Sequence, residues 1–350
     1  MSRSRVIPPA TYVRWALVVA AGAVGARHLY RDAAALRTVA PDLRTPIMFL
    51  PVAPGGPRHL KAMRRMSNVE FPVARGVSIA STNVPSADGR PIRIVTYQRS
   101  ERTRPSAALV WIHGGGTVLG SPEQGNAKCS HWANEIDLLV ASVDYRLAPE
   151  HPFPAALDDC YDALCWLHDN ADDLGVDRSR IAVGGDSAGG MLAAVLCQVA
   201  RDRGRPPICF QLLEYPMLDD RSTLRPPPRT RSFVWTPAAN RFGWTSYLGH
   251  RPTPNDDRSY AAPARTTDLS RLPPAWIGVG DIDLLHDEAV TYAARLRRAG
   301  VTCELDVLPG LFHGADSIRP KAPTSRAFRN TMTEALRHGI TPRSGSKLAD

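Results

Sequence analysis

Short runs of apolar and β-branched residues alternate with longer amphipathic stretches from about residue 90 onward. The short runs predict β-strands at 92–98, 107–113, 138–145, 181–186, 208–215, 275–280 and 302–309. Most are apolar at nearly every position, which is typical of strands buried on both faces of a parallel sheet. The longer stretches predict helices at 123–136, 155–172, 188–203, 287–299 and 322–338. Strand and helix in alternation predict an α/β fold with a mostly parallel, doubly wound sheet.

Two regions interrupt this alternation and divide the chain into a core and two additions. Residues 1–75 contain helix-like pieces but no convincing strand, and residues 217–262 contain one helix-like run, TPAANRFGWTSYLG. The sequence therefore predicts an N-terminal helical cap segment at 1–75 and a cap insertion at 217–262. The core is predicted at 76–216 and 263–340, and we expect the two additions to pack together as a lid outside the sheet.

The run VGGDSAGGM at 183–191 places one serine in an unusual setting. Ser187 stands between Gly185 and Gly189, after a predicted buried strand and before a predicted helix. A sharp strand-to-helix turn projects such a hydroxyl from the sheet, and glycines without Cβ atoms let the strand and the helix approach closely. A serine that only caps the helix would not require this context. The pattern indicates a nucleophilic serine, with Asp186 as a supporting residue of the motif.

A second glycine cluster, HGGG at 113–116, closes the predicted strand 107–113. Successive glycines leave backbone N–H groups unshielded, so that they can converge on a developing oxyanion. Gly115 and Gly116, together with the N–H of Ala188, are predicted to form an oxyanion hole. A merely flexible loop would explain the glycines but not their pairing with a serine motif downstream. The residues predicted to support this turn are His113 and Gly114.

A nucleophilic serine needs a histidine base and an orienting acid, which in this arrangement follow it in the order acid, then histidine. His313 lies in LPGLFHGAD, a loop directly after the last predicted strand, from which an imidazole can reach over the sheet edge. His313 is therefore the predicted base. The other histidines downstream of the serine are less well placed: His250, His286 and His338.

The acid is expected after the predicted strand 275–280, where the run DIDLLHDEAV offers three aspartates. Asp287 and Glu288 stand where acids stabilise a helix N-terminus, and we interpret both as structural. Asp281 ends the strand and Asp283 lies in the loop. The residues alone leave the choice between these two open.

Taken together, the motifs resemble the hormone-sensitive lipase family of α/β-hydrolases, which includes bacterial carboxylesterases. The resemblance rests on HGGG (113–116), YRLAPEHPFPAALDD (145–159), GDSAGG (185–190), EYPMLD (214–219), DLLHDE (283–288) and PGLFHG (309–314). It implies an α/β-hydrolase fold with a helical cap. The family's acid heads an Asp-x-Leu-x-Asp-Glu motif, which falls on Asp283, so the resemblance implies a triad of Ser187, Asp283 and His313.

Two positions depart from the family's pattern. The family usually has an aromatic residue after HGGG, where this chain has Thr117, and an aliphatic or small residue before Tyr-Pro, where this chain has Glu214. Because of these two differences, the sequence does not predict the shape of the acyl pocket. The rest of the 145–159 run is interpreted as a loop that fixes the oxyanion turn, with Glu150 and Asp159 as hydrogen-bonding supports.

The resemblance implies a carboxylic-ester hydrolase that acts on short-to-medium acyl esters through an acyl-enzyme. A lactone or aryl-amide hydrolase with the same triad is the alternative. A ligand-binding receptor on the same fold is disfavoured, because such receptors lose the triad histidine and His313 is present. The sequence contains no H-E-x-x-H, P-loop or strand-linked G-x-G-x-x-G motif, so we expect no cofactor, no metal and no nucleic-acid partner.

The net charge of +9 resides in residues 1–75, which hold twelve Lys and Arg against three acids. Within them, the twelve-residue apolar run at 15–26 would span about 18 Å as a helix, short of the ~30 Å bilayer core. We expect a retained cap segment that contacts an anionic membrane surface. A cytoplasmic location suits the six cysteines, which have core-like surroundings. A solvated basic face without a partner, and a secretory signal or anchor, remain as alternatives.

Overall fold

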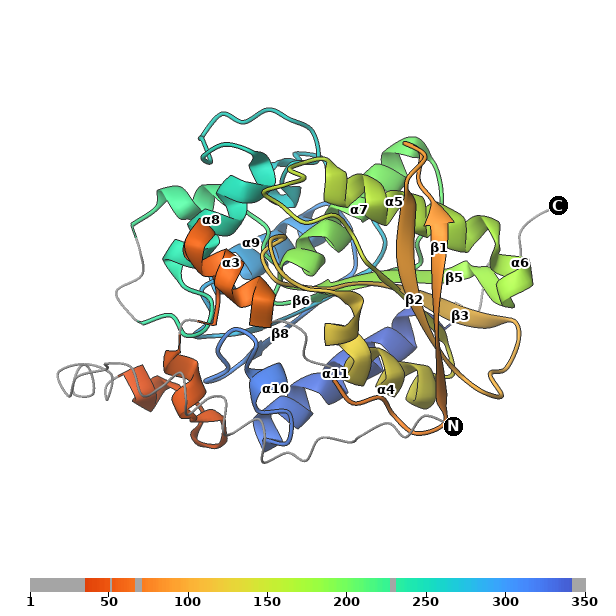
Figure 1. Cartoon of the computed structure of the whole chain (residues 1–350), viewed down its shortest axis with the longest axis horizontal. Helices are drawn as coiled ribbons and strands as arrows, with labels where there is room; N and C mark the ends of the chain where they lie inside the picture. The colour runs from red at the N-terminus through yellow and green to blue at the C-terminus, as the bar shows by residue number, and fades with distance from the viewer. Residues whose placement is uncertain (1–34, 51, 67–70, 227–230, 342–350) are drawn as a thin grey trace.

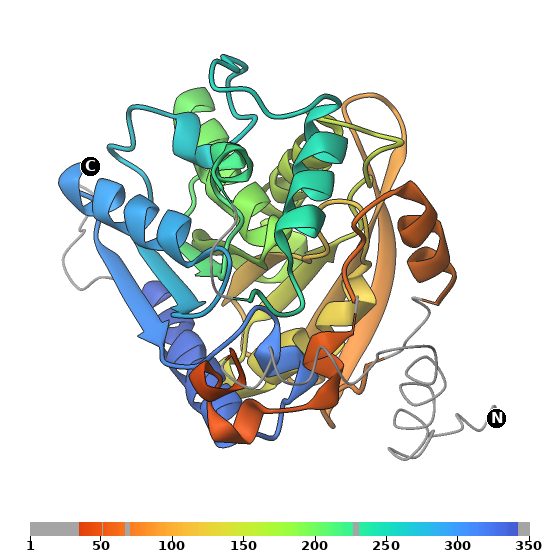
Figure 2. The same cartoon turned by 90° about the vertical axis from the view of Figure 1, so that its left-hand side faces the viewer.

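A single eight-stranded sheet forms the centre of the computed structural model, which describes residues 35–50, 52–66, 71–226 and 231–341 (Figures 1 and 2). The strand order across the sheet is β1-β2-β4-β3-β5-β6-β7-β8. The strands are β1 (Val77–Pro85), β2 (Pro91–Arg99), β3 (Ser106–Ile112), β4 (Leu139–Val143), β5 (Val176–Asp186), β6 (Phe210–Glu214), β7 (Ala275–Gly280) and β8 (Cys303–Leu308).

Strand β2 alone runs against its neighbours, since it pairs antiparallel with both β1 and β4 while every other pair is parallel. Strands β3, β4, β6 and β7 are buried at every position, in agreement with their continuous apolar sequence. The predicted mostly parallel α/β sheet is confirmed. All seven predicted strands are present, and each end lies within five residues of its predicted position.

Helices cover both faces of the sheet. In Figure 1, α4 (Asn126–Ile136) and α11 (Pro323–Gly339) lie below it, while α5 (Ala155–Asp169), α7 (Ala188–Arg203) and α9 (His286–Arg298) lie above it. The five predicted helices correspond to these elements, with two differences. The predicted helix 123–136 begins as a 3₁₀ turn, η3 (Pro122–Gly125), and the predicted helix 155–172 is interrupted at Asn170, after which α6 (Ala171–Leu174) begins.

Strand β1 was not predicted, because its sequence, VSIASTNVP, lacks the apolar continuity of the other strands. It lies at the edge of the sheet, and Val84 is its only buried residue. It nevertheless pairs with β2 along its whole length, from Val77 opposite Arg99 to Pro85 opposite Pro91. Polar side chains on an exposed edge strand fit this position, since they keep the free edge from pairing with other chains.

The two predicted additions contain helices and no strand within the residues that the structure describes. The first contains η1 (Pro41–Leu43), η2 (Pro46–Phe49) and α3 (Pro57–Met66), and the second contains η4 (Asp220–Leu224) and α8 (Pro237–Leu248). Figure 1 shows α3 beside α8. Leu60 of α3 and Phe242 of α8 belong to one apolar cluster with Val118 and Leu119 of the glycine loop. The two additions therefore meet above the glycine loop.

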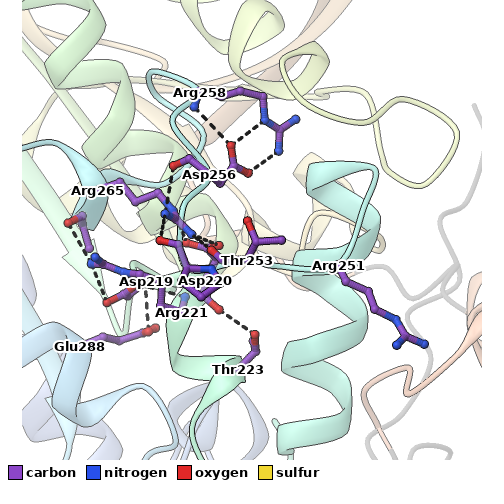
Figure 3. Close-up of polar contacts among 12 residues, drawn as sticks. Asp219, Asp220, Arg221, Thr223, Arg251, Thr253, Asp256, Arg258, Arg265 and Glu288 are labelled. Atoms are coloured by element: carbon purple, nitrogen blue, oxygen red, sulfur yellow. Dashed lines mark hydrogen bonds and ion pairs between the residues drawn. The ribbon is translucent and has the colours of Figure 1, made fainter.

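Ion pairs attach the second addition to the core (Figure 3). Asp220 is fully buried and receives two hydrogen bonds of 2.8 Å from the Arg265 guanidinium. The same guanidinium donates to the backbone oxygens of Pro254 and Asp256, so it joins both ends of the insertion. Arg258 completes the network by pairing with Asp256 at 2.7 Å.

No helix among the described residues is both long and apolar enough to cross a membrane. The apolar run 15–26, together with the predictions made for it, lies outside the described part of the chain.

Candidate active site

Ser187 lies at the turn between β5 and α7 and has a φ of +55°, which is uncommon for a residue with a side chain. Its N–H donates to the backbone oxygen of Glu214 at 2.9 Å. The flanking glycines are needed for close packing. A Cβ atom on Gly189 would lie 1.9 Å from the backbone oxygen of Ile112, and one on Gly185 would lie 2.4 Å from that of Gly189. The strand and helix can meet here only without these side chains.

Three of the predicted residues come together at the carboxyl ends of the parallel strands. His313, in the loop after β8, lies between the other two: its Nε2 is 2.9 Å from Ser187 Oγ, and its Nδ1 is 2.9 Å from Asp283 Oδ2. Asp283 lies in the loop after β7, and its other oxygen accepts the N–H of Leu285 at 2.9 Å. All three side chains are buried, with each residue 4–6% exposed.

The other acids of the DIDLLHDEAV run have different partners. Asp281 is exposed, and its Oδ1 accepts the N–H of Gly310 at 2.7 Å. Asp287 is exposed and pairs with His286. Glu288 is buried and accepts the backbone N–H groups of Leu218 and Asp219, and burial raises its pKa well above the ordinary value. Of these acids, only Asp283 contacts His313.

The remaining histidines lie away from Ser187. His250 pairs with Asp256 at 3.4 Å in the cap insertion, and His286 pairs with Asp287 at 2.9 Å at the start of α9. His338 lies in the last turn of α11. The structure thus brings His313, and none of these three, to the serine.

The glycine loop adopts a conformation that suits residues without side chains. Gly115 and Gly116 have φ values of +106° and +63°, and a Cβ on Gly115 would lie 2.2 Å from the backbone oxygen of Leu119. The N–H groups of Gly115, Gly116 and Ala188 donate to no oxygen of the described residues. These three are the groups predicted to bind an oxyanion.

His113 and Asp186 stabilise the glycine loop through hydrogen bonds and ring packing. Gly114 donates its N–H to Asp186 Oδ1 at 3.0 Å. The His113 ring stacks on Tyr145 with a centroid distance of 4.3 Å, and the Tyr145 hydroxyl donates to the backbone oxygen of His113 at 2.9 Å. Burial lowers the pKa of His113 below its ordinary value, so this imidazole is neutral and serves the loop's structure.

Both departures from the family pattern are buried polar residues. Thr117 donates from Oγ1 to the backbone oxygen of Gly116 at 2.6 Å, and its own backbone oxygen accepts the N–H of Ala148 at 2.9 Å. Glu214 pairs with Lys128. Of the two predicted supports, Asp159 is buried and holds Arg146, whereas Glu150 is largely exposed and pairs with Arg64 of α3 at 2.8 Å.

Part of the predicted cap insertion lies against the predicted base, through residues that the sequence did not single out. The Trp235 ring is 6.0 Å from the His313 ring, and a Cβ on Gly116 would lie 2.4 Å from Trp235 Cη2. Phe233 packs against Phe49 of η2 and against Phe312, which precedes the predicted base. These three aromatic contacts place the insertion over both loops of the site.

The residue between these two aromatics has a strained backbone. Val234 has a φ of +64°, and the N–H of Trp235 donates to the backbone oxygen of Phe233 at 2.7 Å, which closes a γ-turn. A β-branched residue in this conformation costs about 1–3 kcal/mol, so the surrounding contacts must hold it there. Valine is an ordinary residue in a loop, so the sequence does not predict this γ-turn.

The sequence pattern of a known family, described as an alpha/beta hydrolase fold, matches residues 109–317. The chain belongs to this family. The resemblance to the hormone-sensitive lipase branch and the expected α/β-hydrolase fold are confirmed with it.

Curated relatives and solved structures point to one class of enzyme. Carboxylesterase NlhH of Mycobacterium tuberculosis is 43% identical over 238 residues, which are 66% of this chain and 73% of that protein. Esterase LipI of the same organism is 39% identical over 230 residues, 65% of this chain and 72% of the relative.

Among solved structures, a bacterial heroin esterase superimposes with a TM-score of 0.81 at 37% identity, covering 87% of this chain and 99% of its own. Esterase LipW of Mycobacterium marinum superimposes with a TM-score of 0.77 at 34% identity, covering 88% and 98%. The expected class of enzyme, a carboxylic-ester hydrolase, is confirmed at this level.

Proposed function

We propose that the chain hydrolyses short-to-medium acyl esters through a triad of Ser187, His313 and Asp283 and an acyl-enzyme intermediate. The observation that carries the proposal is the pair of 2.9 Å contacts that His313 makes with Ser187 Oγ and Asp283 Oδ2. A serine hydroxyl is a weak nucleophile, and an adjacent base oriented by a third group is the arrangement that activates it.

The chemistry follows from the positions of these atoms. Nε2 of His313 takes the proton as Ser187 Oγ bonds to the ester carbonyl carbon, and the carbonyl oxygen becomes an oxyanion. His313 then returns the proton to the departing alcohol oxygen as the carbon–oxygen bond breaks, which leaves an acyl-serine. A water molecule deacylates the serine by the same steps, and His313 again acts first as base and then as acid. No cofactor is required.

Asp283 and the glycine loop stabilise charge that develops during this reaction. The Asp283 carboxylate accepts the Nδ1–H of His313, which leaves Nε2 free to accept the serine proton and favours the imidazolium that forms. The N–H groups of Gly115, Gly116 and Ala188 are the proposed donors to the oxyanion. Removing one donor from such a hole typically costs about 10²–10³ in kcat.

We further propose that the described parts of the two additions form a cap that selects the acyl chain, with Trp235 as a wall of the pocket. The Trp235 ring lies beside both His313 and Gly116, so it limits the space next to the reacting carbonyl. The apolar contacts of Phe233 with Phe49 and Phe312 hold the insertion in this place.

Replacing Trp235 with alanine is expected to move the acyl-chain optimum toward longer chains, because it removes a buried ring beside the triad. A panel of chromogenic p-nitrophenyl esters with acyl chains of increasing length measures this as kcat/KM for each ester. Leu224→Ala provides the control, since Leu224 belongs to the same insertion but is 47% exposed. Unchanged optima for the Trp235 variant would remove it from the pocket wall.

We also propose that the basic segment 1–75 contacts an anionic membrane surface, on the grounds of its concentrated positive charge. Full-length protein is then expected to cosediment with vesicles containing phosphatidylserine at low salt and to be released at high salt. Vesicles of phosphatidylcholine alone serve as the control. Protein that stays in the supernatant with both vesicles at low salt would contradict surface binding.

A further inference from the structure

Three ionisable side chains lie buried together beside the triad, and the proposed reaction does not use them. Lys128 of α4 pairs with Glu214 at the end of β6, and its Nζ is 3.6 Å from Oδ2 of Asp316 on α10 (Ala315–Ile318). The three side chains are 13%, 0% and 1% exposed, respectively. Charged side chains are rarely buried and are costly there unless they are paired, so this cluster calls for a physical reason.

Glu214, at one end of the cluster, contacts the backbone of the proposed nucleophile. Glu214 of β6 lies opposite Asp186 of β5, and Asp186 directly precedes Ser187 in the chain. The backbone oxygen of Glu214 accepts the N–H of Ser187 at 2.9 Å. A displacement of Glu214 would therefore move the turn that carries the serine.

Asp316, at the other end, is connected through Tyr215 to the proposed base. Asp316 follows His313 by three residues, and its Oδ1 accepts a hydrogen bond from the Tyr215 hydroxyl at 3.0 Å. The Tyr215 ring lies 4.7 Å from the imidazole ring of His313. Tyr215 has a φ of +32°, a conformation that a residue with a side chain keeps only when its contacts hold it.

The charges of the cluster are complementary. Burial raises the pKa of Glu214 well above its ordinary value, which favours a neutral carboxyl. Although burial opposes ionisation of Asp316 as well, the attraction of Lys128 keeps the pKa of Asp316 below its ordinary value. A neutral carboxyl, one carboxylate and one ammonium leave no uncompensated charge. The second Glu214 oxygen has no hydrogen-bond partner among the described residues, which a neutral group tolerates better than a carboxylate.

We propose that Lys128 is a positioning residue for the reaction: its buried ammonium joins Glu214, beside the serine turn, to Asp316, beside the base loop, and so fixes Ser187 relative to His313. The inference rests on the proposed roles of Ser187 and His313. It assigns a function to Glu214, one of the two departures from the family pattern, and to Lys128, which is the only lysine or arginine of α4. A displacement of about 1 Å between reacting groups can cost about 10²-fold in rate.

The test compares variants in which the link is cut while the shape of each side chain is kept. Lys128→Met alone would leave the buried Asp316 carboxylate without a cation and so threaten folding, and the double variant Lys128→Met/Asp316→Asn avoids this because it removes both charges. Asp316→Asn alone is the second variant, since it keeps the oxygen that Tyr215 contacts and leaves Glu214 as the partner of Lys128. The matched control is Thr333→Val, which removes the hydrogen bond that Trp132 of α4 donates and leaves the hydrogen bonds and ion pairs of the cluster in place. Thermal melting identifies the folded variants.

The double variant is expected to lower kcat for a p-nitrophenyl ester by about 10²-fold with little change in KM, and Asp316→Asn by about tenfold. The acid limb of the kcat/KM profile should stay in place, because the double variant removes one ammonium together with one carboxylate, and in Asp316→Asn the Glu214 carboxyl can ionise beside Lys128. The other ionisable groups that face the cluster, Asp186, Cys129 and Arg329, are unchanged in all variants. Thr333→Val should leave kcat and the acid limb as in the wild type.

Folded variants that keep kcat within twofold of the wild type would overturn the inference. If the double variant does not fold, Asp316→Asn decides by the same criteria. Ser187→Ala is assayed in parallel to separate two kinds of failure. Activity that survives in Ser187→Ala contradicts the proposed function itself, whereas an inactive Ser187→Ala beside fully active cluster variants contradicts only the role of Lys128.

Discussion

Ser187→Ala is expected to lower kcat for ester hydrolysis by about 10⁴-fold or more while leaving the fold intact. Among the described residues, the Ser187 hydroxyl hydrogen-bonds to His313 alone, so the change removes the proposed nucleophile and little else. The backbone bonds that hold the turn, to Glu214 and from Met217, do not involve the hydroxyl.

Steady-state kinetics with a chromogenic acetate or butyrate ester measures the loss, and a melting curve shows whether the fold is kept. A folded variant that retains more than a tenth of the wild-type kcat would mean that Ser187 is not the nucleophile.

The second large effect is expected at Asp283. Asp283→Asn should reduce kcat by about 10⁴-fold, because an amide in place of the carboxylate favours the wrong imidazole tautomer and no longer stabilises the imidazolium. Asp281→Asn should lower kcat far less, since Asp281 is exposed and accepts a hydrogen bond from the N–H of Gly310. Asp287→Asn should be close to the wild type, because Asp287 lies at the surface beside His286.

The three variants share a single-atom change of the same kind, so each serves as a control for the others. An inactive Asp281→Asn beside an active Asp283→Asn would reverse the assignment of the acid and would leave the reaction class unchanged.

The sequence predicts the parts of this site that depend on local geometry. The serine turn and the glycine loop can be predicted because close backbone approach demands glycine at fixed spacing, and the structure has contacts of 1.9–2.4 Å for hypothetical side chains at Gly185, Gly189 and Gly115. The base could be predicted from its place after the last strand. The acid could not be chosen from the residues alone, since Asp281 and Asp283 both follow β7 and their contacts depend on how the loop folds.

The parts that the sequence does not reveal are set by contacts between distant segments. Strand β1 is polar and exposed, so its pairing with β2 leaves no apolar pattern. Trp235 reaches the triad only because the insertion folds back over the glycine loop. Lys128 stands in an ordinary helical run, and its partners Glu214 and Asp316 are 86 and 188 residues away along the chain. Of these three residues, the sequence singled out only Glu214, because it departs from the family's pattern.

Covalent labelling of the nucleophile tests the central claim, acyl transfer through Ser187, most directly. Diethyl p-nitrophenyl phosphate reacts with an activated serine by displacement of p-nitrophenolate, and leaves a diethylphosphoryl group on the attacking oxygen. Intact-protein and peptide mass spectrometry of the full-length chain measure the stoichiometry and the position of this group. We predict one group per chain, on the peptide containing Ser187, with activity lost in proportion to labelling and no label in Ser187→Ala. Complete loss of activity with Ser187 unmodified, or labelling at another residue that persists in Ser187→Ala, would contradict it.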